Sequence, residues 1–401
     1  MIQTIAGFNR IGEENAFAVL ARANALAAQG GVGGRSVINL GIGQPDFATP
    51  DHIVEAGIKA LRDGHHGYTD ARGIAAVREG VARYTHERTR ADVSPDNVLI
   101  VPGGKVTMYA AIAMMGEPGA DILYPDPGFP IYRSMIEFTG ATPIPIPITE
   151  ENAFAFKATD VLQRITEKTR LIILNSPANP TGGVTPKAEI DALVAGLEKH
   201  PDVAILSDEI YERMTYDAYG PADRHVSLLT YPSIRDRLIV LNGWSKTWAM
   251  TGWRMGWSIW PDGDGSDLYD KARKLAVNCW SCVNAPSQWA GLAALDGPQH
   301  DVNDMMTAFA RRRRLVVDGL NALPGVSCIE PEGAFYAYPN INQTGFKAKD
   351  LATKLLDEMG VALIGGPDFG ILGEGYIRLS YAASEANIEE ALGRMQEFLE
   401  R

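Results

Sequence analysis

The sequence predicts an α/β fold with a large, doubly wound and mostly parallel sheet, together with a smaller α+β domain. Three short, entirely apolar runs at 171–174, 203–206 and 238–241 have the composition of strands that are buried on both faces of a sheet. A segment of helical pattern at 187–199 separates the first two runs. Such alternation of strand and helix is typical of β-α-β units and therefore of parallel strand pairing.

The length of the chain favours more than one domain. A single hydrophobic core rarely supports 401 residues. We predict an N-terminal arm at 1–15, a large domain at 46–290, and a small domain formed by 16–45 together with 291–401. The arm has little core of its own, and the character of the sequence changes beyond about residue 290.

Composition and charge exclude several classes of protein. With 46% hydrophobic and 21% charged residues the chain is an ordinary globular protein, and its net charge of -12 does not favour nucleic acid or anionic lipid as a partner. It contains no apolar run of 18 residues, and its first residues do not form a secretion signal. We therefore expect a cytoplasmic protein without a membrane or nucleic-acid partner.

A pair of cysteines and a separate acidic segment could suggest metal sites, but neither predicts one. Cys279 and Cys282 form a C-x-x-C pair, but no second pair or nearby His completes a zinc site, so we interpret them as buried thiols. The acidic stretch at 261–268 lacks the glycine and glutamate of a calcium loop and is better explained as a turn with a helix cap. We expect no bound metal.

The N-terminal part predicts helices at 17–28 and 51–62, and a third helix in the segment that follows Tyr68. Between the first two helices, the glycines of the sequence around Gly41 and Gly43 resemble a dinucleotide fingerprint only superficially. Asp46 occupies the position of the third glycine, and Pro45 would obstruct the start of a helix. The bare backbone instead suits close approach of a ligand.

The next segment predicts strand, turn, helix and strand, with Gly103 and Gly104 in the turn. A glycine turn that opens a helix presents free backbone N–H groups and the positive end of the helix dipole, which together bind anions. Beyond it, the repeated prolines at 143–148 exclude an interior strand and predict an edge strand or an extended connector. The residues at 157–170 predict a helix.

Each apolar run ends in polar residues, and in open α/β sheets the carboxyl edge of the strands is where ligands bind. Lys246 follows the third run among tryptophans, and removal of a lysine from water makes its amine a nucleophile. Asp208 follows the second run and needs a cationic partner or several hydrogen-bond donors, and Arg254 lies between small residues that suit a phosphate. The alternatives are a helix cap at Asp208 and a surface turn around Lys246.

Lysine, aspartate and arginine together meet the needs of pyridoxal phosphate. A lysine carries the aldehyde carbon, an aspartate keeps the ring nitrogen protonated, and an arginine binds the phosphate.

The C-terminal part predicts a helix at 302–320, antiparallel strands at 325–339, and a strand around Arg378. Strand alternation puts Ile377 and Leu379 on one face and Arg378 on the other, away from the core. Without further context, Arg378 would be interpreted as a surface arginine opposite Glu374.

Four motifs resemble the class I and II aminotransferases, which are fold-type I pyridoxal-phosphate enzymes. They are NPTG at 179–182, DEIY at 208–211, SK at 245–246 followed by GWRMGW at 252–257, and RLSY at 378–381. Their order and rough spacing match the family along nearly the whole chain.

The resemblance implies a role for each matching residue. Lys246, Asp208 and Tyr211 would be catalytic, with Lys246 bound to the cofactor and Tyr211 and Asn179 on its 3'-oxygen. The cofactor-binding set is completed by Gly104, Lys105, Phe129, Ser245, Arg254 and, from the other subunit of a homodimer, Tyr68. Substrate would be bound by Gly43, Tyr132, Asn179 and Arg378.

The implied activity is transamination between amino acids and 2-oxo acids by a ping-pong mechanism. Some similar members use the lysine of a GGK sequence, here Lys105, to recognise a distal carboxylate, which favours aspartate with 2-oxoglutarate as acceptor. Trp244 and Tyr132 add aromatic bulk, which keeps open an enzyme for alanine, aromatic or specialised amino acids. A carbon–sulfur lyase of the same fold is a further alternative.

Overall fold

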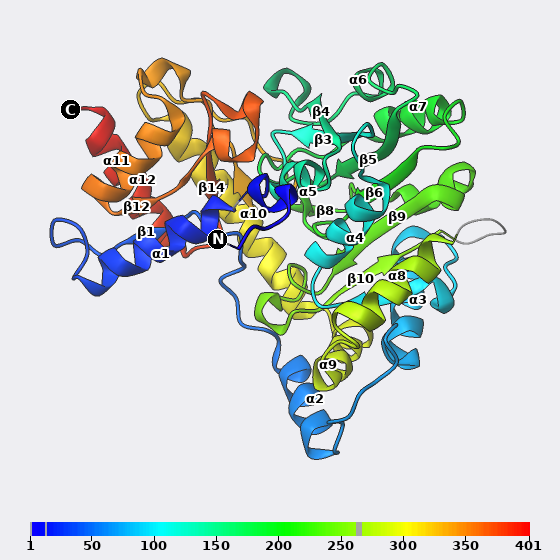
Figure 1. Cartoon of the computed structure of the whole chain (residues 1–401). Helices are drawn as coiled ribbons and strands as arrows, with labels where there is room; N and C mark the ends of the chain where they lie inside the picture. The colour runs from blue at the N-terminus through cyan, green and yellow to red at the C-terminus, as the bar shows by residue number, and fades with distance from the viewer. Residues whose placement is uncertain (1, 13, 262–266) are drawn as a thin grey trace.

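The computed structural model describes residues 2–12, 14–261 and 267–401. Its largest sheet has seven strands in the order β2-β10-β9-β6-β5-β3-β4 (Figure 1). The strands are β2 (Val98–Val101), β3 (Asp121–Asp126), β4 (Thr142–Pro147), β5 (Thr169–Asn175), β6 (Ala204–Asp208), β9 (Leu238–Gly243) and β10 (Gly256–Ile259). All neighbours pair in parallel except β10, which is antiparallel to both β2 and β9. The predicted mostly parallel sheet is confirmed.

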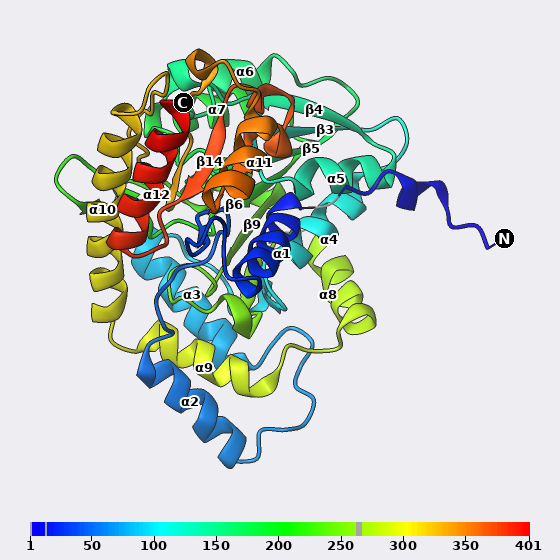
Figure 2. The same ribbon diagram turned by 90° about the vertical axis from the view of Figure 1, so that its left-hand side faces the viewer.

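Both faces of this sheet are buried, which explains the apolar runs. Successive residues of a strand point to opposite faces. In β9, Leu238 and Val240 belong to one hydrophobic cluster, whereas Ile239 and Leu241 belong to the other. The helices around the sheet are α3 (Ala75–Thr89), α4 (Lys105–Met115), α5 (Ile131–Thr139), α6 (Ala158–Leu162), α7 (Lys187–Leu197), α8 (Leu268–Cys279) and α9 (Ala285–Asp296) (Figures 1 and 2).

A second group of elements lies beside the large sheet, at the left of Figure 1. It contains a three-stranded sheet of β11 (Tyr336–Ala337), β14 (Ile377–Ser380) and β13 (Ile364–Gly365), in which β14 is antiparallel to both neighbours. The helices α10 (His300–Asn321), α11 (Ala348–Met359) and α12 (Glu385–Leu399) accompany it. The division of the chain into an arm and two domains stays a prediction.

The N-terminal helix joins this second group. In α1 (Asn15–Ala28), Ala23 packs in a small hydrophobic cluster with Leu356 of α11. After it, β1 (Ile38–Asn39) pairs in parallel with β12 (Val361–Ala362). The remaining elements are α2 (Asp51–Arg62) and the short pair β7 (Thr215–Tyr216) and β8 (Pro221–Ala222).

Two sequence predictions concern strand β4 and the segment after it. The proline-rich β4 lies at the edge of the sheet, as predicted. The helix predicted over 157–170 is wrong for most of its length, because α6 ends at Leu162 and β5 begins at Thr169. The hydroxyl of Thr169 accepts from the Thr166 amide, and such local bonds compete with the helical pattern.

The cysteine interpretation is also corrected. Cys279 is exposed and Cys282 is half-buried, since they lie at the end of α8 and in the turn beyond it. The turn predicted over 261–268 falls largely outside the described residues. In the described ranges, no helix is both long enough and apolar enough to cross a bilayer.

Candidate active site

A cavity of about 470 Å³ lies at the carboxyl edge of the large sheet. Asn175 and Asp208 are the last residues of β5 and β6 and face each other in register. Lys246 follows the end of β9 by three positions. Because parallel strands end at one edge, their terminal side chains converge there. Arg378 of the second group also lines the cavity, which therefore brings together residues distant in the sequence.

Lys246 is half-buried in this cavity. Its Nζ donates to the Gly43 carbonyl oxygen at 2.5 Å and lies 5.9 Å from the ring centroids of Tyr211 and Phe335. Burial lowers the pKa of Lys246 to about 8, an effect that the Glu14 carboxylate opposes. A lysine with such a pKa has a large neutral fraction near physiological pH and can act as a nucleophile or a base.

Asp208 lines the cavity and is almost fully buried, with 2% of its surface exposed. Its carboxylate accepts from the Tyr132 hydroxyl at 2.6 Å and from the Ile210 amide at 3.3 Å. Burial raises the pKa of Asp208 to about 6, so a cation placed beside it would be favoured. Residues 210–213 form a turn instead of a helix, so the alternative of a helix cap is wrong.

One end of the cavity combines the glycine turn with Arg254. Gly103 has φ +91, and a Cβ at this position would lie 2.2 Å from Nη2 of Arg254. The absence of a side chain therefore allows the guanidinium to approach the turn. Lys105 begins α4 at the same place, and the first N–H groups of a helix have no partner within the helix. Backbone donors and a guanidinium form a suitable site for a phosphate.

Arg378 lies buried at the other end, with 3% of its surface exposed. Its guanidinium carbon is 4.6 Å from the Tyr336 ring centroid and 4.7 Å from that of Phe369. Nη1 donates to Asn179 Oδ1 at 2.9 Å and Nη2 donates to the Gly41 carbonyl oxygen, whereas Nε has no partner among the described residues. The alternative of a surface arginine is wrong, because β14 turns this side chain into the interior between the two groups of elements.

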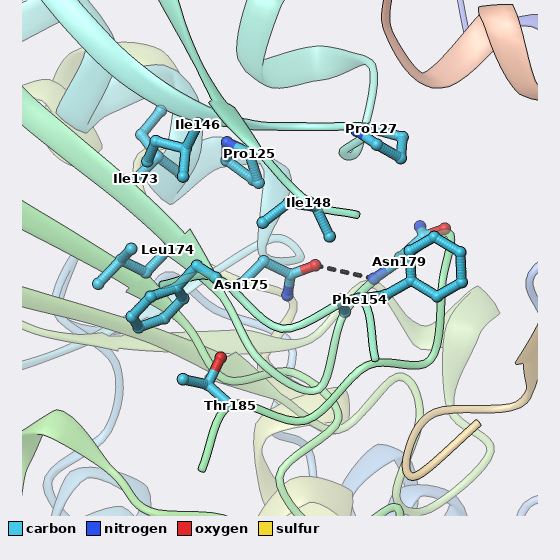
Figure 3. A pocket seen from close by; sticks show the side chains of 12 residues that line it. Pro125, Pro127, Ile146, Ile148, Phe154, Ile173, Leu174, Asn175, Asn179 and Thr185 are labelled. Atoms are coloured by element: carbon cyan, nitrogen blue, oxygen red, sulfur yellow. Dashed lines mark hydrogen bonds between the residues drawn. The ribbon is translucent and has the colours of Figure 1, made fainter. Parts of the chain in front are cut away.

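The NPTG loop positions Asn179 through Asn175. The Asn179 amide donates to Asn175 Oδ1 at 2.9 Å, the bond drawn in Figure 3, and Asn175 Nδ2 donates to the Asp208 carbonyl oxygen at 3.1 Å. These two bonds tie the loop to the strand that carries Asp208. The pocket in Figure 3, of about 10 Å³, lies beside the loop and is too small for a substrate.

The cavity contains all but one of the predicted site residues. Those that line it are Gly43, Gly104, Lys105, Phe129, Tyr132, Asn179, Asp208, Tyr211, Ser245, Lys246, Arg254 and Arg378. Tyr68 does not: it is 91% exposed and lies between α2 and α3. The individual roles stay predictions, and the Tyr132 hydroxyl, predicted to meet substrate, is bonded to Asp208.

The residues that line the cavity but were not predicted as site residues include Glu14, Asn175 and Tyr336. The hydroxyls of Tyr336 and Tyr211 are 2.7 Å apart. Asn175 could have been found, since it ends an apolar run in the same way as Asp208. No pattern in the sequence singles out Glu14 or Tyr336.

Comparison with known proteins agrees with this arrangement. Residues 35–395 match the family profile of aminotransferase class I and II. An aspartate aminotransferase of Streptomyces avermitilis is 37% identical over 97% of this chain and 94% of its own length. Solved structures of the aspartate aminotransferase of Rhizobium meliloti and of an alanine aminotransferase of Pyrococcus furiosus both match this chain with a TM-score of 0.91. The first is 31% identical over 100% of each chain, and the second 29% identical over 99% of this chain and 100% of its own.

The chain belongs to the class I and II aminotransferases. It is therefore a transferase of amino groups that depends on pyridoxal phosphate. The cavity fits this cofactor, because the glycine turn with Arg254, the lowered pKa of Lys246 and the buried Asp208 provide an anion site, an amine and a partner for a ring cation.

Gly103→Ala is expected to weaken cofactor binding at least tenfold, because its Cβ would displace Arg254 from the glycine turn. Gly119→Ala is the matched control, with φ +96 but open space around the added methyl group. Both variants carry the backbone strain of a left-handed residue. Titration of each apoprotein with pyridoxal phosphate measures the difference, and equal affinities would contradict the assignment of this turn.

The reactivity of Lys246 is expected to follow its lowered pKa. Only the neutral amine attacks an aldehyde, so the rate of cofactor attachment to the apoprotein should rise with pH and level off above about 8. The rate is measured by borohydride reduction at fixed times and mass analysis of the labelled peptide, with Lys246→Ala as the unlabelled control. A rate that still rises tenfold per pH unit above pH 9 would contradict the burial argument.

Proposed function

We propose that this aminotransferase moves the amino group of L-aspartate to 2-oxoglutarate by a ping-pong mechanism. The observation that supports this choice is the position of Lys105, whose side chain lines the same cavity as Lys246 and Arg378. With Lys246 as the reactive amine and Arg254 assigned to the phosphate, Lys105 and Arg378 are the two remaining cations of the described lining, and two cations suit a substrate with two carboxylates.

In this proposal Arg378 and Asn179 bind the α-carboxylate. Arg378 is already oriented by Asn179 and by the two aromatic rings on either side of it, so little conformational freedom is lost when a carboxylate binds. The side chain of Lys105 then binds the distal carboxylate. Because a bound substrate is held at both ends, its α-hydrogen is presented to one face of the cavity.

Lys246 is the base that takes the α-proton and returns it. Its lowered pKa makes the neutral amine available, and its bond to the Gly43 carbonyl keeps Nζ inside the cavity. Pyridoxal phosphate, when bound, supplies an aldehyde that accepts the amino group and a protonated ring that withdraws electrons. Asp208 holds the ring proton, with Tyr132 orienting the carboxylate, and Tyr211 and Asn179 donate to the 3'-oxygen.

We further propose that Gly104, Lys105, Ser245 and Arg254 hold the phosphate, with Phe129 against the ring. Lys105 would serve through both its backbone N–H and its side chain, because these point to different parts of the cavity in a residue at the start of a helix. Gly43 permits close approach of the Tyr336 hydroxyl, since a Cβ there would lie 2.3 Å from it. We propose that the same bare backbone faces the substrate.

We also propose a homodimer with shared active sites, in which Tyr68 reaches the phosphate bound by the other subunit. Tyr68 is exposed, and the N-terminal arm leaves Ile2, Ile5 and Phe8 exposed although it is anchored to α5 through Arg10. Three exposed apolar side chains within one short segment are typical of a surface that a second copy of the chain covers.

An enzyme for alanine or aromatic amino acids is the second candidate, favoured by the aromatic lining of the cavity. A half-reaction screen separates the candidates: the holoenzyme is mixed with each amino acid, and the loss of the visible absorbance of the cofactor is followed. We expect aspartate and glutamate to react fastest. Lys105→Gln should then lower kcat/KM for aspartate about tenfold or more and leave that for alanine within about twofold, because only aspartate loses a charge partner.

Inertness toward both dicarboxylates would overturn the proposed substrate. Release of pyruvate and ammonia from cystathionine, with no 2-oxo acid added as an acceptor, would instead identify a carbon–sulfur lyase.

The shared site predicts complementation between two inactive variants. Lys246→Ala and Tyr68→Ala should each be impaired, whereas a mixture refolded together should regain activity, because one site of each mixed dimer contains both native residues. Light scattering measures the size of the particle. A monomer, or a mixture no more active than its components, would contradict the dimer proposal.

A further inference from the structure

Glu14 places a carboxylate inside the cavity where the proposed function requires a substrate carboxylate. Its Oε2 lies 2.5 Å from Nζ of Lys105, and the two side chains are 19% and 42% exposed. Glu14 occupies the position before α1, where a side chain often caps the helix, but its carboxylate makes no cap bond. The side chain is therefore turned toward Lys105 and the cavity and not toward its own helix.

The charges around the cavity make this carboxylate significant. Among the described lining residues the cations are Lys105, Lys246, Arg254 and Arg378, and the acids are Asp208 and Glu14. Asp208 is bonded to Tyr132, which leaves Glu14 as the acid beside Lys105. The field of Glu14 extends to the reacting amine, since after burial it has the largest effect on the pKa of Lys246, which it raises.

Aromatic rings surround the pair. Nζ of Lys105 is 5.2 Å from the ring centroid of Phe17 and 5.4 Å from that of Phe129. These rings keep the ammonium near Glu14, which precedes α1, and near Phe17 of α1, and both of these residues line the cavity. A distal group that reaches Lys105 must therefore meet Glu14 as well.

We propose that Glu14 is a specificity-determining residue, which weakens the binding of substrates with a distal carboxylate and permits substrates with an uncharged distal group. This proposal rests on the proposed function only in assigning the distal group to Lys105. A distal carboxylate must share the ammonium with Glu14 and is repelled by it at short range. An amide accepts from Lys105 while it donates to Glu14, and a small apolar side chain leaves the pair intact.

Glu14 thus acts as an internal replacement for the distal carboxylate. Without it, a neutral amino acid would leave the ammonium of Lys105 unpaired in a half-buried site, which is unfavourable. With Glu14 present, Lys105 stays paired when a neutral substrate is bound. The same cavity can therefore bind a charged substrate in one half of the ping-pong reaction and a neutral substrate in the other half.

Aspartate and asparagine, which have nearly the same shape, provide the test. In Glu14→Gln the ratio of kcat/KM for aspartate to that for asparagine should rise about fivefold or more, because the repulsion is removed and Lys105 is free. Glu117→Gln, an exposed change of the same kind beyond α4, should leave the ratio unchanged. Glu14→Ser removes the charge and introduces a favoured cap residue, so the test does not depend on the folding of one variant.

A binding measurement decides the inference independently of activity. Calorimetry of the holoenzyme with succinate and with butyrate should show about fivefold tighter binding of succinate to Glu14→Gln and Glu14→Ser than to the wild type. Butyrate should bind no more tightly to these variants, because its uncharged end leaves Lys105 unpaired. Equal changes for the two ligands, or none, would overturn the role of Glu14. A wild-type enzyme inert toward aspartate would refute the proposed substrate, while the succinate result would still decide the inference.

Discussion

The site depends on the burial of the large sheet on both faces. Helices cover each face, so polar side chains in β5, β6 and β9 are accommodated only where the strands end. Parallel pairing puts those ends at one edge, and the register of β5 with β6 places Asn175 opposite Asp208. The convergence of distant residues is therefore a consequence of strand direction, and the chemistry of the cavity follows from burial at that edge.

The electrostatic character of the cavity has the same origin. Lys246 and Asp208 have pKa values shifted in opposite senses, both chiefly by removal from water. Since burial disfavours the charged form of either group, each gains from a bound partner of opposite charge. Both groups are therefore buried at a cost in free energy that a bound ligand offsets. Tyr132 and Asn175 keep Asp208 in place, and the Gly43 carbonyl oxygen holds Lys246.

The buried strands and their mostly parallel direction were predictable from apolar runs, and Lys246 and Asp208 from the polar residues that follow those runs, because these are local patterns. Most other residues of the cavity, among them Asn179, Tyr211 and Arg378, were assigned through the resemblance of motifs to a known family. Reasoning from local patterns failed where contacts between distant parts of the chain determine the position of a side chain. Arg378 belongs to an exposed-looking strand but is enclosed by Tyr336 and Phe369, which approach from elsewhere in the chain. Glu14 lies in a polar N-terminal segment, and its meeting with Lys105 depends on how α1 sits over the cavity. The short α6 shows that local hydroxyl bonds can override a helical pattern.

Because β10 runs antiparallel to its neighbours, a single short segment of the chain carries both Lys246 and Arg254. Gly256, its first residue, pairs with Val101 at the end of β2 and with Gly243 at the end of β9. The chain leaves the sheet at Gly243, passes Lys246 and re-enters just after Arg254, so a single excursion supplies both the amine and the guanidinium. The number of residues in that excursion sets the span between the two groups, which means that insertions or deletions there should be far less tolerated than elsewhere on the surface of this enzyme.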